Sequence, residues 1–79
     1  MKVHVRLFGT LGNSVVGHDP LEGLTVELPD NTTIAELIAD LGVPAAKVGM
    51  VSVNRRLVKP RHVLQSADEV RIFRPIFGG

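Results

Sequence analysis

The sequence predicts a two-layer α+β domain in which one helix lies across a single mixed β-sheet. Apolar and polar residues alternate in the segments Lys2–Phe8, Leu24–Leu28 and Asp68–Phe73. A period of two is typical of strands that bury one face. A single further segment, 34–41, carries apolar residues at helical spacing. One apolar helix stripe and several one-sided strands are buried together when the helix covers one face of the sheet.

The strands and the loop of the N-terminal half are predicted as follows. In Lys2–Phe8, one face carries Val3, Val5 and Leu7. The segment Gly9–Gly23 holds four of the eight glycines, so we expect a long loop there, with a bent hairpin through Val15–Val16. A second strand follows over Leu24–Leu28, and Pro29–Asp30 ends it.

The helix has the strongest local signal. Thr33 and Glu36 have the spacing of a capping box, in which each side chain binds a backbone amide of the other residue. Gly42 provides a residue suited to the left-handed conformation after the last turn, and Pro44 prevents the helix from resuming. The apolar stripe between these signals consists of Ile34, Leu37, Ile38 and Leu41.

The C-terminal half predicts a small hairpin and a final strand. Met50–Val53 is the third strand, Asn54–Arg55 is the turn because Asn tolerates positive φ, and Leu57–Val58 is the return strand. Lys59–Gln65 is a connection, and Asp68–Phe73 is the last strand. The first and last strands are the longest, so we place them side by side at the centre of the sheet.

Length and composition limit the possible functions. The chain has 79 residues, of which 44% are hydrophobic and 22% charged, and we expect one globular domain over residues 1–79. The absence of cysteine excludes a disulfide scaffold, a thiolate metal site and a cysteine nucleophile. The net charge is +1 and there is no Trp or Tyr, which gives nucleic-acid binding little support.

Hydropathy gives no sign of a membrane protein. The longest unbroken apolar run is three residues, 37–39, far too short for a membrane span. Met1–Phe8 alternates polar and apolar residues, and no apolar block typical of a signal peptide is found there. We therefore expect a cytoplasmic protein with neither a membrane nor a nucleic acid as partner.

Site chemistry of the usual kinds is not indicated. The histidines at 4, 18 and 62 have no metal-binding spacing, and Gly9–Gly12 lacks the Gly-Lys-Ser/Thr of a phosphate loop. We therefore expect no metal site. A basic cluster, defined as Arg55, Arg56, Lys59, Arg61 and His62, favours a solvated hairpin edge that discourages aggregation. The alternative is a docking patch for an acidic partner.

The C-terminal segment Arg74–Gly79 is harder to explain as structure. Glycine loses the most conformational entropy on ordering, so a structural role for Gly78 and Gly79 is implausible. Pro75 cannot donate to a sheet, and we expect a mobile, extended tail over 74–79. Ile76 and Phe77 are then exposed apolar anchors for the groove of a partner. The α-carboxylate of Gly79, next to residues without a β-carbon, can pass through a narrow channel to a reactive centre.

Five segments carry a resemblance to a known family: Val3–Phe8, Thr33–Leu37, Val53–Asn54, Asp68–Val70 and Gly78–Gly79. They make the sequence similar, over essentially its whole length, to the MoaD/ThiS family of ubiquitin-like sulfur carriers. The resemblance implies a β-grasp fold, with one main helix packed across a mixed sheet of four to five strands and a flexible C-terminal tail. The sequence departs from the family pattern at Arg55 and Ala67, where glycine is common.

The resemblance implies a carrier protein and not a stand-alone enzyme. In this family an E1-like enzyme binds ATP and Mg²⁺ and adenylates the terminal glycine, so this chain needs no cofactor of its own. Sulfur from a persulfide donor then displaces AMP, and the resulting thiocarboxylate passes sulfur to an acceptor synthase subunit. Carried onto this sequence, the resemblance implies that Gly79 is the acyl site and that Gly78, which has no side chain, lets the terminus enter a narrow channel of the partner. The other partner-binding residues are then Arg74, Pro75, Ile76 and Phe77, with Phe73 and Phe8 beside them.

Several functions stay open. The tail is most similar to that of the molybdopterin synthase small subunit, where a proline occupies the place of Pro75. An alternative is a carrier of sulfur for thiamine thiazole, or for another thiometabolite or tRNA. Thiamine thiazole carriers usually lack that proline, and their loop is shorter than Gly9–Gly23. The same carboxyl terminus would also serve a ubiquitin-like modifier. A last alternative is a non-reactive interaction module that binds through the sheet face formed by Arg6, Phe8, Arg71 and Phe73.

Overall fold

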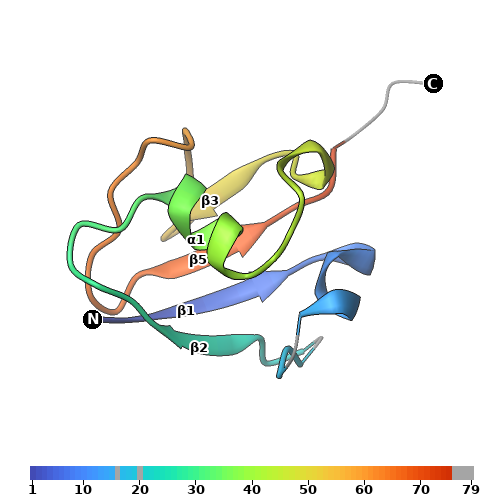
Figure 1. Ribbon diagram of the computed structural model, residues 1–79, viewed down its shortest axis with the longest axis horizontal. Coiled ribbons are helices and arrows are strands. Elements are labelled where there is room, and N and C mark those ends of the chain that lie inside the picture. Colours follow the sequence, from blue (N-terminus) through green and yellow to red (C-terminus); the bar gives the residue numbers. More distant parts are fainter. Residues whose placement is uncertain (16, 20, 76–79) are drawn as a thin grey trace.

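The structure is a computed structural model that describes residues 1–15, 17–19 and 21–75 (Figure 1). These residues form five β-strands, one α-helix and two short 3₁₀ helices. In chain order the elements are β1 (Lys2–Leu7), η1 (Gly9–Ser14), β2 (Leu24–Glu27), α1 (Ile34–Asp40), η2 (Ala45–Lys47), β3 (Val51–Val53), β4 (Arg56–Val58) and β5 (Glu69–Ile72).

The strands form one mixed sheet in the order β2-β1-β5-β3-β4. β1 and β5 run parallel and place Val5 beside Val70 and Leu7 beside Ile72. The other pairs, β1 with β2, β3 with β4 and β3 with β5, are antiparallel. The predicted α+β class and the central pairing of the first and last strands are therefore confirmed.

The core lies between α1 and one face of the sheet, over which the helix passes in Figure 1. Ile34 and Leu37 of α1 are fully buried, and Leu41, just after the helix, is half-buried. The inward residues of β1 and β5 alternate with outward ones, as the period of two predicts. The fully buried strand residues are Val3, Val5, Val70 and Ile72.

The ends of α1 follow their local signals. The Thr33 hydroxyl accepts a hydrogen bond from the Glu36 amide at 3.2 Å, and the Thr33 amide donates to the Glu36 carboxylate at 3.0 Å. This amide bond, together with the Thr33 hydroxyl, lowers the pKa of Glu36. Gly42 has a φ of +76° just after the helix, as expected for a left-handed C-terminal residue.

The segment after β1 corrects one prediction. We predicted a loop over Gly9–Gly23, but Gly9–Ser14 forms the 3₁₀ helix η1. Leu11 is buried in η1 and Val15 directly after it, and both join the main core. A 3₁₀ turn advances only about 2 Å per residue, so this short piece can return both side chains to the core. Val16, part of the predicted hairpin, lies outside the described residues.

The burial of Leu64 was also not predicted. Leu64 lies in the predicted connection Lys59–Gln65, yet it is 2% exposed and belongs to the core. Its amide donates to the Thr32 carbonyl at 2.8 Å, and Val63 forms an isolated bridge with Thr33. The connection is therefore attached to the segment that begins α1.

Asn54 links the small hairpin to the start of β5. Both turn residues have positive φ, 51° at Asn54 and 70° at Arg55, the pattern of a tight two-residue hairpin. The Asn54 amide nitrogen donates to Asp68 Oδ1 at 3.0 Å, and its Oδ1 accepts from the Glu69 amide at 3.0 Å. Asp68 Oδ2 also accepts from the Gln65 amide at 2.8 Å.

Ala67 provides a test of this backbone geometry. Its φ is +69°, a left-handed conformation that costs an L-residue about 1–2 kcal/mol. We expect Ala67→Gly to raise the free energy of unfolding by about 0.5–1 kcal/mol, after the larger entropy loss of glycine is subtracted. Ala39→Gly, at an exposed position inside α1, should instead lower it by about 1 kcal/mol. Urea unfolding measures the free energy of unfolding of both variants. A loss of stability in Ala67→Gly would contradict the left-handed backbone conformation at position 67.

Candidate functional site

The chain leaves the sheet beside residues 49 and 50. Although β5 ends at Ile72, the pairing continues for one residue. The Phe73 amide donates to the Met50 carbonyl at 2.9 Å, and the Gly49 amide donates to the Phe73 carbonyl at 2.7 Å. Arg74 and Pro75 follow directly and form the described stem of the tail. The stem therefore starts from a point held by two backbone hydrogen bonds.

An aromatic pair lies next to this stem. The rings of Phe8 and Phe73 stack with centroids 4.6 Å apart and an interplanar angle of 11°. The Phe8 amide donates to the Ile72 carbonyl at 3.0 Å, so the parallel ladder continues to the position of the two rings. Both residues are only half-buried. The Arg6 guanidinium lies 4.8 Å from the Phe8 centroid, within the range of a cation–π contact.

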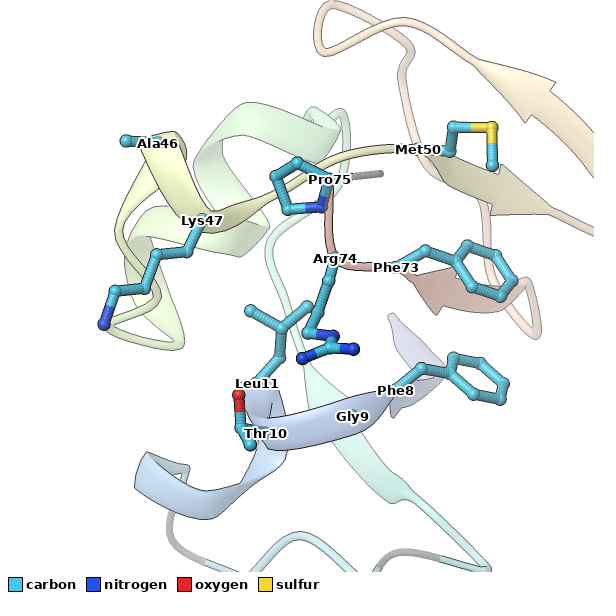
Figure 2. A pocket seen from close by; sticks show the side chains of 10 residues that line it. All are labelled: Phe8, Gly9, Thr10, Leu11, Ala46, Lys47, Met50, Phe73, Arg74 and Pro75. Atoms are coloured by element: carbon cyan, nitrogen blue, oxygen red, sulfur yellow. The ribbon is translucent and has the colours of Figure 1, made fainter. Parts of the chain in front are cut away.

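The stem borders an open hollow of about 760 Å³. Figure 2 shows the two phenylalanine rings side by side, with Arg74 extending away from them toward Leu11. Gly9 has a φ of +65°, and a β-carbon there would lie 2.7 Å from Arg74 Nε. Glycine therefore leaves room for the arginine side chain. The residues that line the hollow are Phe8, Gly9, Thr10, Leu11, Ala46, Lys47, Met50, Phe73, Arg74 and Pro75.

Gly49 is a residue of this region that sequence reasoning missed. A β-carbon on Gly49 would lie 2.5 Å from the Arg74 carbonyl oxygen and 2.7 Å from Pro75 Cα. These are backbone atoms, which cannot rotate away as a side chain can. The sequence around position 49 has no turn motif, so the need for glycine arises only from the close approach of a segment 25 residues further along the chain.

The structure places the predicted site residues in two groups. Phe8, Phe73, Arg74 and Pro75 are brought together around the hollow. The other predicted residues, Ile76, Phe77, Gly78 and Gly79, lie outside the described part of the chain, and so does the predicted mobility of that segment. Their roles stay predictions.

The polar residues that gave weaker signals have local surroundings of their own. His18 accepts a hydrogen bond at Nε2 from the Leu7 amide at 3.0 Å, and His4 contacts the Glu22 carbonyl. No group of three or more His, Asp or Glu residues suited to a metal occurs within residues 1–15, 17–19 and 21–75. The basic cluster, Arg55, Arg56, Lys59, Arg61 and His62, is exposed throughout.

Gly49→Ala tests the close approach of the stem. The added methyl group must push the backbone at Arg74 and Pro75 away, which weakens the hydrogen bond from residue 49 to Phe73. We expect the free energy of unfolding to fall by about 1 kcal/mol and the amide of residue 49 to exchange its hydrogen faster. Met50→Ala is the control, because Met50 is 45% exposed and its backbone bond to Phe73 is kept. Unchanged exchange at residue 49 would contradict the geometry.

The aromatic pair is expected to contribute little to folding. Phe8→Ala removes a half-exposed stack worth about 0.5–1.5 kcal/mol beyond its buried area. Ile72→Ala removes a fully buried core side chain and should cost about 2–5 kcal/mol. Chemical denaturation of both variants compares the two losses. Equal losses would mean that Phe8 is a core residue and not part of a free surface.

No helix in the described ranges is long and apolar enough to cross a membrane.

The comparisons with known proteins agree with this architecture. No curated protein matches the chain. Among solved structures, a putative molybdopterin converting factor subunit 1 from Pyrococcus furiosus has a TM-score of 0.71 at 20% identity, with 95% of this chain and 98% of that one covered.

Two further structures share the fold. A chain in the complex of subunits 1 and 2 of molybdopterin-converting factor from Helicobacter pylori has a TM-score of 0.63 at 24% identity, with both chains fully covered (100% each). Small archaeal modifier protein 1 from H. volcanii has a TM-score of 0.69 at 13% identity, with 95% and 98% covered. The family model described as ThiS matches residues 5–79. The chain therefore belongs to the ThiS family, and its fold is the ubiquitin-like β-grasp.

Proposed function

We propose that this chain is a sulfur carrier whose reacting group is the α-carboxylate of Gly79. The observation that supports this most is the position of the stem. Arg74 and Pro75 leave the sheet at the border of the half-buried Phe8–Phe73 pair. An apolar surface at the base of a tail suits a protein that is held by a partner while its end reacts. The match to the ThiS family extends to residue 79 and supports the same proposal.

The chemistry needs an activating partner. A carboxylate is a poor acyl donor, so an oxygen of the Gly79 carboxylate attacks the α-phosphorus of ATP on an E1-like enzyme with Mg²⁺, and pyrophosphate leaves. The outer sulfur of a persulfide donor then attacks the carbonyl carbon and displaces AMP. A thiol attacks the resulting acyl disulfide, which releases the thiocarboxylate and forms a disulfide on the donor side. In this scheme Gly78 and Gly79 expose the carbonyl carbon without a side chain nearby.

The body of the protein then acts as a recognition unit. Phe8 and Phe73 present ring faces that a partner can cover, and Arg74 adds a cation at the start of the tail. Ile76 and Phe77 supply apolar side chains further along. ATP and Mg²⁺ are substrates of the partner, and this chain is the protein that reacts and not the catalyst.

We propose molybdopterin synthesis as the pathway that receives the sulfur. The proline at position 75 supports it, and so does the fold shared with a putative molybdopterin converting factor subunit 1 and with a chain of the H. pylori molybdopterin-converting factor. The H. pylori structure is a complex of subunits 1 and 2, and an acceptor subunit from a complex of that kind is the proposed partner here. A thiamine thiazole carrier and a protein modifier are the alternatives. The fold shared with a small archaeal modifier protein favours the modifier among them.

Intact-mass measurement tests the proposal. The chain is incubated with its adenylating enzyme, ATP, Mg²⁺ and a persulfide donor. We expect a mass gain equal to the difference between one sulfur and one oxygen atom. A variant that lacks Gly79 should show no gain, whereas Arg61→Gln, in the exposed basic cluster, should react like the unmodified chain.

Other results would favour other functions. Conjugates of higher mass in cell extract, lost when Gly79 is removed, would support the modifier. A full biological function after removal of Gly78 and Gly79 would refute both reactive roles and leave the interaction module.

A further inference from the structure

Two arginines occupy the middle of the sheet face opposite α1. Arg6 on β1 and Arg71 on β5 are register partners, and their neighbours along each strand are buried core residues. Both arginines therefore point to the open face, where they are half-buried. On the other side of Arg71 the row continues with Ser52 and Leu57. Adjacent strands lie about 4.8 Å apart, so the two side chains start from neighbouring positions, and both line one small hollow.

These arginines lack an anionic partner within the described ranges. In those ranges, the ion pair with a nitrogen–oxygen distance of 4.0 Å joins the N-terminus to Asp30, and neither arginine takes part in it. The Arg6 Nε is buried and has no hydrogen-bond acceptor among the residues that the structure describes. Glu22 and Glu69 line the same small hollow as both arginines, yet neither carboxylate comes within 4.0 Å of a guanidinium.

The neighbouring part of the sheet supplies no acid either. Residues 41–67, which include β3 and β4, contain no Asp or Glu. The same segment holds five cationic residues, namely Lys47, Arg55, Arg56, Lys59 and Arg61. Like charges directly beside each other on adjacent strands destabilise a sheet. Arg6 and Arg71 are such a pair in the register of β1 and β5, and a carboxylate from outside would offset their like charges.

The surroundings suit a carboxylate presented by a protein. Phe8 and Phe73 each follow two residues after one of the arginines, just beyond the ends of β1 and β5. The Arg6 guanidinium lies 4.8 Å from the Phe8 ring centroid, and the stack of the two rings borders the stem of the tail. At the far end of the arginine row, Leu57 is 69% exposed. An anion between Arg6 and Arg71 would thus lie among apolar contacts, where water is excluded and charge-assisted hydrogen bonds are strong.

We propose that Arg6 and Arg71 together bind an Asp or Glu side chain of the enzyme that activates Gly79. This inference rests on the proposed function, because it takes the activating enzyme as the occupant of the open face. The location supports that choice, since a protein that covers the Phe8–Phe73 pair and holds the tail also covers the two arginines. The pair makes the contact selective for an acidic residue at that point of the partner.

Charge reversal tests the pair. ATP–pyrophosphate exchange by the activating enzyme is measured against the concentration of the unmodified chain, of Arg71→Glu and of Arg71→Gln. We expect KM to rise about tenfold or more for Arg71→Glu, less for Arg71→Gln, with kcat within about twofold because the tail is untouched. Arg56→Glu makes the same change in net charge on β4 and should leave KM within about twofold.

The free protein gives an independent readout. Arg71→Glu places a carboxylate beside Arg6, so its urea midpoint should equal or exceed that of the unmodified chain at low salt, and high salt should reduce the gain. Arg71→Gln should not lower the midpoint. A marked loss of stability in Arg71→Gln would show that the fold itself holds this guanidinium, and would overturn the proposal.

The kinetic outcomes separate the two proposals. An equal rise of KM in Arg71→Glu and Arg56→Glu would mean general attraction between charged surfaces, and unchanged KM in both would mean no contact. Either result overturns the arginine site and leaves the sulfur-carrier proposal intact. Absence of exchange with the unmodified chain overturns the carrier proposal and, with it, the activating enzyme as the partner of the arginine pair.

Discussion

The parallel pairing of β1 with β5 is the constraint on which the rest of this structure depends. It joins the two ends of the chain at the middle of the sheet, with β2 on one side and β3 and β4 on the other. On the inner face the pairing places Val5 beside Val70 and Leu7 beside Ile72, under α1. On the outer face the same register brings Arg6 to Arg71, and one step further the ladder brings Phe8 to Phe73. One set of backbone hydrogen bonds thus builds both the core and the candidate docking surface.

This arrangement explains how so short a chain can present a surface without losing its core. The apolar residues of β1 and β5 point to the inner face, where they pack in one core with Ile34 and Leu37. The outer face is free to carry residues that contribute less to folding, including a half-exposed aromatic stack and two cations at register positions. Like charges placed side by side cost stability, which indicates that the face has another use.

Much of the fold could be predicted from the sequence because its signals are local. The Thr33–Glu36 box, the alternation in β1 and the turn at Asn54 each depend on residues close in the chain. The 3₁₀ helix η1 and the burial of Leu64 could not be predicted, since a single apolar residue in a loop does not reveal which core it reaches. The need for glycine at position 49 could not be predicted for a related reason. The backbone atoms that approach Gly49 belong to Arg74 and Pro75, which are remote in sequence.

The candidate site was predictable only in part. Phe8 and Phe73 stand at the outward positions of their strands, so alternation alone placed them on one face. That the two rings touch follows from the parallel register, which depends on the complete sheet. The lack of an anionic partner for Arg6 and Arg71 among the described residues could not be predicted either, because net charge counts Glu22 and Glu69 as available although neither comes within 4.0 Å of a guanidinium.

The attachment of Phe73 to residues 49 and 50 fixes where the stem leaves the sheet. Two backbone hydrogen bonds hold Phe73, and Gly49, which has no side chain, lets Arg74 and Pro75 pass close to its backbone. A protein that covers the Phe8–Phe73 pair therefore meets the stem at one defined distance and direction from the rings. Rotation of that protein about the rings is restricted, so a small contact sets the orientation of the whole domain.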